Sequence, residues 1–113
     1  MSFSRGGNRR HRDCARLFSA LGDQSRLAIV EKLADGSSHS ISELAEGAAV
    51  TRQALSKHLR VLEEVGLVRG RRTGRENRFH LVPEPLNEAM KSLSLISAQW
   101  DDALQRLKNF VEE

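Results

Sequence analysis

The segment TRQALSKHLRVLEEVG, residues 51–66, has the pattern of one amphipathic helix with defined ends. Thr51 carries a hydroxyl that can cap a helix at its start, and Gly66 can end the helix. The apolar residues recur at steps of four and three, which places them on one stripe: Leu55, Leu59 and Leu62. The remaining faces carry no acidic residue before Glu63. Because a helix face that meets only water usually mixes both signs of charge, this face indicates an anionic partner.

The outer face of this helix is polar and basic. Its residues are Thr51, Arg52, Gln53, Ser56, Lys57 and Arg60. Arginine and glutamine can read base edges through paired hydrogen bonds, whereas lysine and hydroxyl side chains suit phosphate or single-base contacts. We therefore interpret these residues as candidate DNA contacts. A solvated helix face is the alternative interpretation.

The positive charge of the chain is concentrated in two segments. The formal net charge is +3 over 113 residues. Residues 1–16 contribute +4 and residues 51–83 contribute +5, whereas residues 17–50 and 84–113 are each at −3. A basic stripe on an otherwise near-neutral domain is typical of a protein that binds a polyanion.

Length and composition exclude several classes of protein. A chain of this length with 39% apolar residues predicts one small domain with a single modest core. No apolar run approaches the ~18 residues of a membrane span, and no signal-peptide pattern is present. The lone cysteine, Cys14, excludes an internal disulfide framework. We expect a cytoplasmic protein with no membrane partner.

The N-terminal half of the chain predicts an arm and two helices. Residues 1–12 are rich in glycine and arginine, which predicts a flexible basic arm before a domain at 13–113. One short helix is expected from Asp13 to Gly22. The cap Asp23 then starts a second helix, whose apolar positions we expect to face inward: Leu27, Ile29, Val30 and Leu33.

A helix-turn-helix pattern follows. A brief helix from Ser42, with Leu44 inward, and a tight turn lead into the helix at residues 51–66. In a helix-turn-helix unit, the second helix enters the major groove of DNA.

A basic β-hairpin comes next, in LVRGRRTGRENRFHLV, residues 67–82. Its turn is predicted at Thr73 and Gly74, with Phe79 and Leu81 alternating inward. Five arginines lie in or beside it: Arg69, Arg71, Arg72, Arg75 and Arg78. The hairpin residues that we expect to contact DNA are Arg72, Thr73, Arg75 and Asn77. The predicted fold is mainly α with a small β-hairpin wing, a winged helix-turn-helix in the order α-α-α-α-β-β-α.

The C-terminal segment predicts a long amphipathic helix, at about 84–112, after a PEP break. Its apolar stripe consists of Leu86, Met90, Leu93, Ile96, Trp100, Leu104, Leu107 and Val111, with Phe110 alongside, and those from Leu86 to Leu107 are the expected dimer contacts. A single winged domain is too short to cover that stripe, which favours a shared dimer interface over an intrachain core. Leu17 and Leu21 of the first helix are the expected facing surface.

Three stretches together resemble the ArsR family of bacterial transcriptional regulators: LFSALGDQSRLAIVEKLADG at 17–36, SISELAEG through RENRFHL at 40–81, and PEPLNEAM through KNFVEE at 83–113. The tail is similar to the SdpR-like, or autorepressor, branch, which has no metal site. The resemblance implies a homodimer formed by the first and last helices. It also implies a recognition helix at Thr51–Val65 and repression by promoter occlusion.

The chain departs from the metal-sensing members of that family. Arsenic sensors carry a Cys-x-Cys stretch where this chain has Ser40 and Ser42, and zinc sensors carry ligands on the last helix, where residues 98–113 contain no histidine. Hydroxyl groups and isolated carboxylates are poor substitutes for those ligands. We therefore expect no metal and no cofactor.

The remaining histidines and the cysteine predict no chemistry. His58 lies beside the leucine stripe and is expected to be a packed ring, and neither His39 nor His80 has a ligand at metal spacing. His11 and Cys14 are three residues apart, as a base and nucleophile can be, but no acid orients the imidazole. We do not expect an enzyme.

These observations predict a sequence-specific DNA-binding regulator. We expect it to be a homodimeric repressor that binds a palindromic site in duplex DNA, with its two recognition helices roughly 34 Å apart. Two alternatives remain open. One is a regulator gated by a small molecule in a dimer-interface pocket lined by Met90, Leu93 and Trp100. The other is a winged module for protein contacts, which requires apolar anchors on the outer face.

Overall fold

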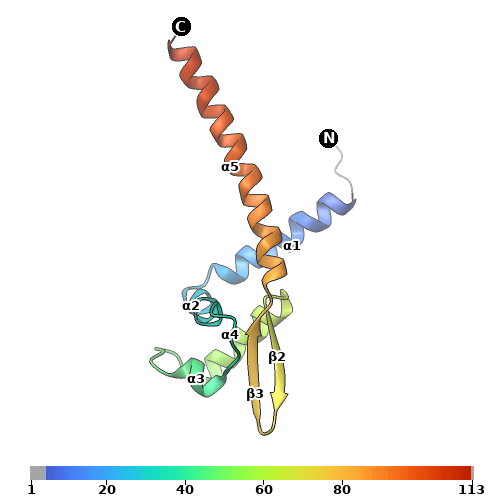
Figure 1. Ribbon diagram of the computed structural model, residues 1–113, viewed down its shortest axis with the longest axis vertical. Coiled ribbons are helices and arrows are strands. Elements are labelled where there is room, and N and C mark those ends of the chain that lie inside the picture. Colours follow the sequence, from blue (N-terminus) through green and yellow to red (C-terminus); the bar gives the residue numbers. More distant parts are fainter. Residues whose placement is uncertain (1–4, 113) are drawn as a thin grey trace.

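The computed structural model describes residues 5–112. Its elements are α1 (Arg5–Leu21), α2 (Gln24–Leu33), β1 (His39–Ser40), α3 (Ile41–Ala45), α4 (Arg52–Glu64), β2 (Val68–Thr73), β3 (Glu76–Leu81) and α5 (Pro83–Glu112). Figure 1 shows α2, α3, α4 and the hairpin gathered at one end, with α5 projecting away from them. The predicted winged helix-turn-helix order is confirmed, with one short additional strand.

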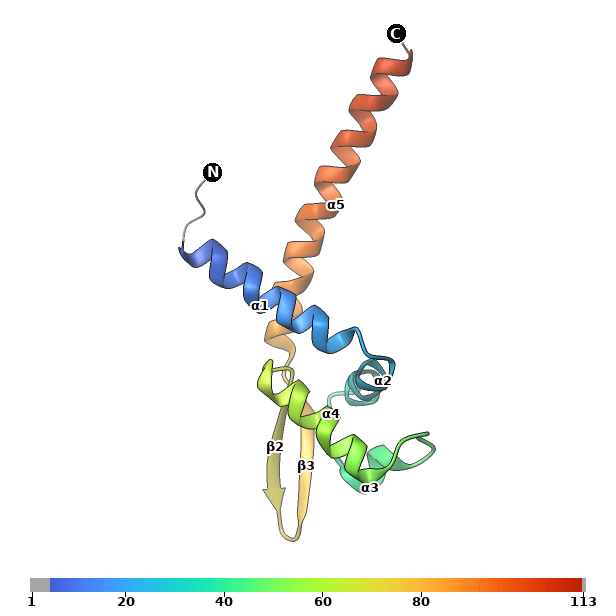
Figure 2. The same cartoon turned by 180° about the vertical axis from the view of Figure 1, so that it is seen from behind.

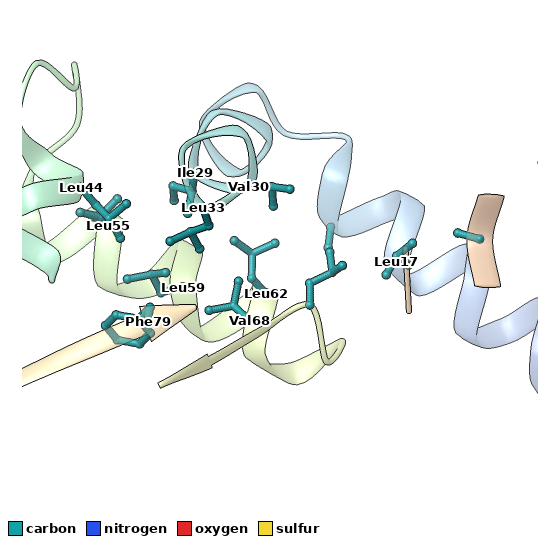
Figure 3. Close-up of a cluster of buried hydrophobic side chains, with 13 residues drawn as sticks. Leu17, Ile29, Val30, Leu33, Leu44, Leu55, Leu59, Leu62, Val68 and Phe79 are labelled. Atoms are coloured by element: carbon teal, nitrogen blue, oxygen red, sulfur yellow. The ribbon is translucent and has the colours of Figure 1, made fainter. Parts of the chain in front are cut away.

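One apolar core joins the helices to the sheet (Figure 3). The largest fully buried side chains are all leucines: Leu33, Leu44, Leu55, Leu59, Leu62 and Leu67. Three of them are the predicted stripe of α4, so that stripe is confirmed. Burying each such side chain contributes about 1.5–3 kcal/mol to the stability of the fold. The stripe is therefore the main contact that holds α4 on the core.

The sheet has the strand order β1-β3-β2, and both pairings are antiparallel. Gly70 of β2 lies opposite Phe79 of β3, and the buried Phe79 ring fills the space above the glycine. A Cβ atom at Gly70 would lie 2.9 Å from a ring carbon of Phe79. The sequence did not predict β1, because two residues are too few to show an alternating pattern.

Four details of the prediction are corrected. α1 begins at Arg5 rather than Asp13, so residues 5–12 of the expected arm are helical, and residues 1–4 lie outside the described residues. Arginine has a high helix propensity, so the arginines at positions 9, 10 and 12 are compatible with helix. α3 begins at Ile41 behind the cap Ser40, not at Ser42.

α2 and α5 supply the other two corrections. Leu27 is 42% exposed, because α2 turns Ile29, Val30 and Leu33 towards the core instead. α5 begins at Pro83, so the PEP segment is its first turn rather than a break before it. Proline suits this position because the first amide of a helix needs no intrahelical acceptor.

The cap of α3 provides a test of the fold. Ser40 is buried, and its Oγ accepts a hydrogen bond of 3.1 Å from the backbone N–H of Glu43. We expect Ser40→Ala to lower the free energy of unfolding by ~0.5–2 kcal/mol, as measured by urea denaturation. The matched control is Ser42→Ala, which removes an exposed hydroxyl and should change the value by less than about 0.5 kcal/mol. Equal losses in the two variants would contradict the capping role.

Candidate nucleic-acid interface

The start of α4 is fixed by its cap and by the turn before it. The Thr51 Oγ1 accepts a hydrogen bond of 3.1 Å from the Ala54 backbone N–H, which confirms the predicted cap. Gly47, in the preceding turn, has a φ of 70°, a conformation that glycine adopts at little cost. The turn and the Thr51 cap therefore define where α4 begins.

The outer face of α4 is free. With the leucine stripe buried, all six of the predicted contact residues are exposed: Thr51, Arg52, Gln53, Ser56, Lys57 and Arg60. Within residues 5–112, the last five of these have no side-chain hydrogen bond or ion pair. Their donors are therefore available to an external ligand.

The hairpin lies beside α4 at the same end of the molecule (Figure 2). Its turn is made by Gly74, whose φ of 63° is in the left-handed region. The four predicted wing residues, Arg72, Thr73, Arg75 and Asn77, are all exposed around this turn. The outer face of α4 and the wing tip thus both carry exposed basic side chains at this end of the molecule.

Arg78 differs from the other hairpin arginines. It is half-buried and turns towards α3, where its guanidinium donates two hydrogen bonds to the Glu43 carboxylate, at 3.1 and 3.2 Å. It also donates to the Ser38 carbonyl oxygen at 2.8 Å and to Glu76 at 3.1 Å. These hydrogen bonds hold the pKa of the Glu43 carboxyl below its usual range and raise the pKa of Arg78. Charge counting in the sequence could not separate Arg78 from its neighbours.

His58 is a packed ring, as predicted. It lies on the side of α4 that faces α2, with its Nδ1 3.4 Å from the Arg26 guanidinium and 3.9 Å from the Asp23 carboxylate. Arg26 in turn donates its Nε–H to the Ala20 carbonyl oxygen at 2.6 Å. These contacts connect α4 to the junction of α1 and α2.

The described residues offer no metal site. Within residues 5–112, no group of three or more histidine, cysteine, aspartate or glutamate side chains could hold a metal ion. His39 is paired with Asp35 at 3.3 Å and with Glu43 at 3.5 Å. Over the same residues, no helix has the length and apolar character needed to cross a bilayer.

The second candidate surface is the apolar face of α5. Six residues of the predicted stripe are at least 49% exposed: Met90, Leu93, Ile96, Trp100, Leu104 and Leu107. Leu21 and Leu86 are half-buried and pack on the core. Leu17 is only 3% exposed and belongs to the intrachain core, so in the single chain it presents almost no surface to a partner. α1 packs across the base of α5, and Leu17 of α1 is part of the core cluster.

Sequence reasoning missed one member of this surface, the exposed Phe18 of α1. Phe110 and Val111, near the end of α5, are exposed as members of the apolar face that the sequence predicts. A cavity of ≈ 510 Å³ lies where α1, the end of α4 and the start of α5 meet, lined in part by Cys14, Val65 and Pro85. None of the three residues expected to line a small-molecule pocket borders it.

The structure has the three features of a winged helix-turn-helix DNA-binding protein: a helix-turn-helix unit, an exposed basic face on its second helix, and an arginine-rich hairpin. Comparison with known proteins supports this class. Residues 11–71 match a family described as a helix-turn-helix domain. YuzN of Bacillus subtilis, an uncharacterized HTH-type transcriptional regulator, is 36% identical over 81 residues, which covers 66% of this chain and 88% of YuzN.

Solved structures identify which family of helix-turn-helix regulators the chain resembles. An ArsR-like transcriptional regulator from Rhodococcus sp. RHA1 matches with a TM-score of 0.74 and 37% identity, over 88% of this chain and 93% of that chain. Mb0332 of Mycobacterium bovis, described as a homodimeric winged helix-turn-helix DNA-binding domain, shares the fold with a TM-score of 0.64 and 24% identity, over 90% of this chain and 91% of Mb0332. The chain belongs to the ArsR-like helix-turn-helix transcriptional regulators, a family of DNA-binding regulators and not of enzymes.

The ion pair between Glu43 and Arg78 predicts a pH dependence. Because the folded-state pKa of Glu43 is lowered, the pair stabilises the fold above the unfolded pKa of about 4.3, and this contribution is lost as the pH falls through the folded pKa. We expect the stability difference between the wild type and Glu43→Gln to be largest above pH ~5 and to shrink under acid, in denaturant titrations from about pH 7 to 3. In an Arg78→Gln background the trend should become much smaller, because Arg78 is the main cause of the lowered pKa of Glu43. A trend of undiminished size there would show that another group is the main cause.

Proposed function

We propose that the protein is a homodimeric transcriptional repressor that binds a palindromic operator. In this proposal, the two α4 helices, related by the dimer axis, enter successive major grooves roughly 34 Å apart, and the wings touch flanking phosphates or the minor groove. The observation that carries the proposal is the exposed face of α4, which has no acid before Glu63 and lies beside the arginine-rich hairpin. A polar, basic face of this kind argues against a winged module for protein contacts.

The side-chain types suggest a division of roles. Arg52 and Gln53, in the first turn of α4, are assigned to base edges. Thr51, Ser56, Lys57 and Arg60 are assigned to phosphates or single bases. The wing residues Arg72, Thr73, Arg75 and Asn77 are assigned to the backbone of the duplex beside the major-groove site.

The dimer is proposed on the exposed apolar stripe of α5. Trp100 is 64% exposed in the single chain, and an uncovered apolar stripe of this length is unusual on a monomeric protein. The description of Mb0332 as homodimeric supports the same assembly here. A dimer joins two subunits that each bind one half-site, so the second contact with DNA becomes intramolecular. This can raise the affinity for DNA by ~10²–10⁴.

We further propose that the protein represses transcription by covering a promoter, that it acts in the cytoplasm, and that it needs no metal. The support for metal independence is the serine pair at positions 40 and 42 and the absence of histidine from residues 98–113. These features also support a place in the SdpR-like, or autorepressor, branch. Binding to a duplex from the protein's own promoter would be consistent with autoregulation.

The DNA contacts are tested by two substitutions. Gln53→Ala should relax discrimination at one position of the site by ~1–3 kcal/mol, because a base-edge contact is lost. Arg75→Ala should weaken binding to every duplex and reduce the salt slope by about 0.9 for each lost phosphate contact. Fluorescence anisotropy with selected and random duplexes over a salt series measures both effects. A wild-type protein that prefers no duplex over random DNA would contradict the proposal.

The dimer is tested by placing a charged side chain on the apolar stripe of α5. Trp100→Glu should produce a monomer in sedimentation at micromolar concentration, and Trp100→Ala should cost ~3–5 kcal/mol if the ring is fully buried in the dimer. Leu95→Glu is the matched control, because Leu95 is also exposed but lies off the stripe. A wild-type monomer that still binds a palindromic duplex tightly would rule out this mechanism.

A further inference from the structure

The hydrogen bonds of Arg78 connect three parts of the chain. Its guanidinium joins β3 of the wing to the Glu43 carboxylate of α3 and to the Ser38 carbonyl oxygen before β1. Its Nε also donates to the Ser38 Oγ at 3.0 Å. A two-point hydrogen-bonded contact between arginine and a carboxylate fixes direction as well as distance. Arg72 and Arg75, nearer the tip, make no such contact with any described residue.

Arg78 lies where the wing leaves the body of the protein. The pairing of β1 with β3 ends at Ser40 opposite Arg78, so from Asn77 to the turn β3 has only β2 beside it. The next residue, Phe79, is buried in the core, whereas residues 71–77 are exposed. An isolated two-stranded ribbon has little stability of its own and twists strongly. The direction of the wing tip therefore depends on how the ribbon is held at Arg78.

The other end of the contact is fixed to the recognition helix. Glu43 lies in α3, the first helix of the helix-turn-helix, and α3 packs directly on α4. The Ser40 cap and the burial of Leu44 hold α3 in place. The Glu43–Arg78 contact consequently links the position of the wing to that of α4.

We infer that Arg78 and Glu43 are positioning residues for DNA binding: they hold the wing at the distance and angle from α4 at which both elements contact one duplex. This role rests on the wing contacts of the proposed function, and it adds the contact that aligns the wing with α4. A wing that is already held in its bound position loses less conformational freedom on binding than a mobile wing, and so it contributes more to the affinity for DNA. Neither residue touches the DNA.

The direction of the effect separates positioning from bulk electrostatics. Removing the Glu43 carboxylate raises the net charge by one and leaves Arg78 unpaired from α3. General attraction to phosphate therefore predicts tighter DNA binding. Loss of wing alignment predicts weaker binding. Glu76 provides the matched control, because it also pairs with Arg78, at 3.1 Å, but from within the wing.

The experiment compares Glu43→Ala with Glu76→Ala on the duplex that the wild-type protein selects from a random pool. We expect Glu43→Ala to bind about three- to tenfold more weakly and Glu76→Ala to bind as tightly as the wild type or more tightly. Arg78→Lys keeps the charge but loses the two-point contact, and it should weaken binding in the same direction. In a background of Arg72→Ala with Arg75→Ala, the loss caused by Glu43→Ala should disappear, because the wing then has little to align.

A distance measurement checks the mechanism directly. Spin labels on cysteines placed at positions 57 and 73, in a Cys14→Ser background, report the separation of α4 and the wing tip. We expect Glu43→Ala to broaden the distance distribution and Glu76→Ala to leave it narrow. Equal behaviour of the two variants, in affinity or in distance, overturns the inference. Unchanged affinity of the Arg72→Ala, Arg75→Ala protein overturns the wing contact of the proposed function, and the inference with it.

Discussion

The arrangement of the molecule depends on the burial of one apolar stripe of α4. Leu55, Leu59 and Leu62 are each at most 1% exposed, and they meet α2, α3 and the sheet in a single core. A helix has a fixed angular spacing, so burying these leucines determines which side chains face outward. The polar face of α4 follows from the packing of its opposite side and needs no separate constraint. Stability and the presentation of the basic surface therefore come from the same contacts.

Local patterns in the sequence predicted most of the elements. The cap Thr51, the leucine spacing and the turn at Gly74 are short-range signals, and each has its expected place in the structure. The two-residue strand β1 and the half-buried position of Arg78 depend on which segments meet across the fold, and no local pattern records that. The candidate contact residues were predictable because exposure of one face follows from burial of the other.

The errors at the helices have a related origin. Periodicity indicates that a side chain is on an apolar face, but it does not say which neighbour covers that face. Leu17 is covered within the chain as part of the core cluster, whereas Leu27, at an equally apolar position, remains 42% exposed. The start of α1 at Arg5 is not visible in the sequence, because residues 5–12 have too few apolar residues to show a helical period. Arginine-rich segments can be helical without contributing to a core.

The length of α5 gives the protein a mechanical property. α5 is held by α1 near its base, where the Cys14 Sγ lies 3.5 Å from the Ser92 Oγ, and about 20 residues of helix continue beyond that crossing. At 1.5 Å per residue this part is a rigid lever roughly 30 Å long, so a tilt of about 5° at the crossing moves its far end by nearly 3 Å. In a dimer joined along this part of α5, a small rotation where α1 crosses α5 would produce a larger change in the distance between the two DNA-binding surfaces. The spacing of the half-sites that such an assembly tolerates would then be governed by the stiffness of one crossing between two helices.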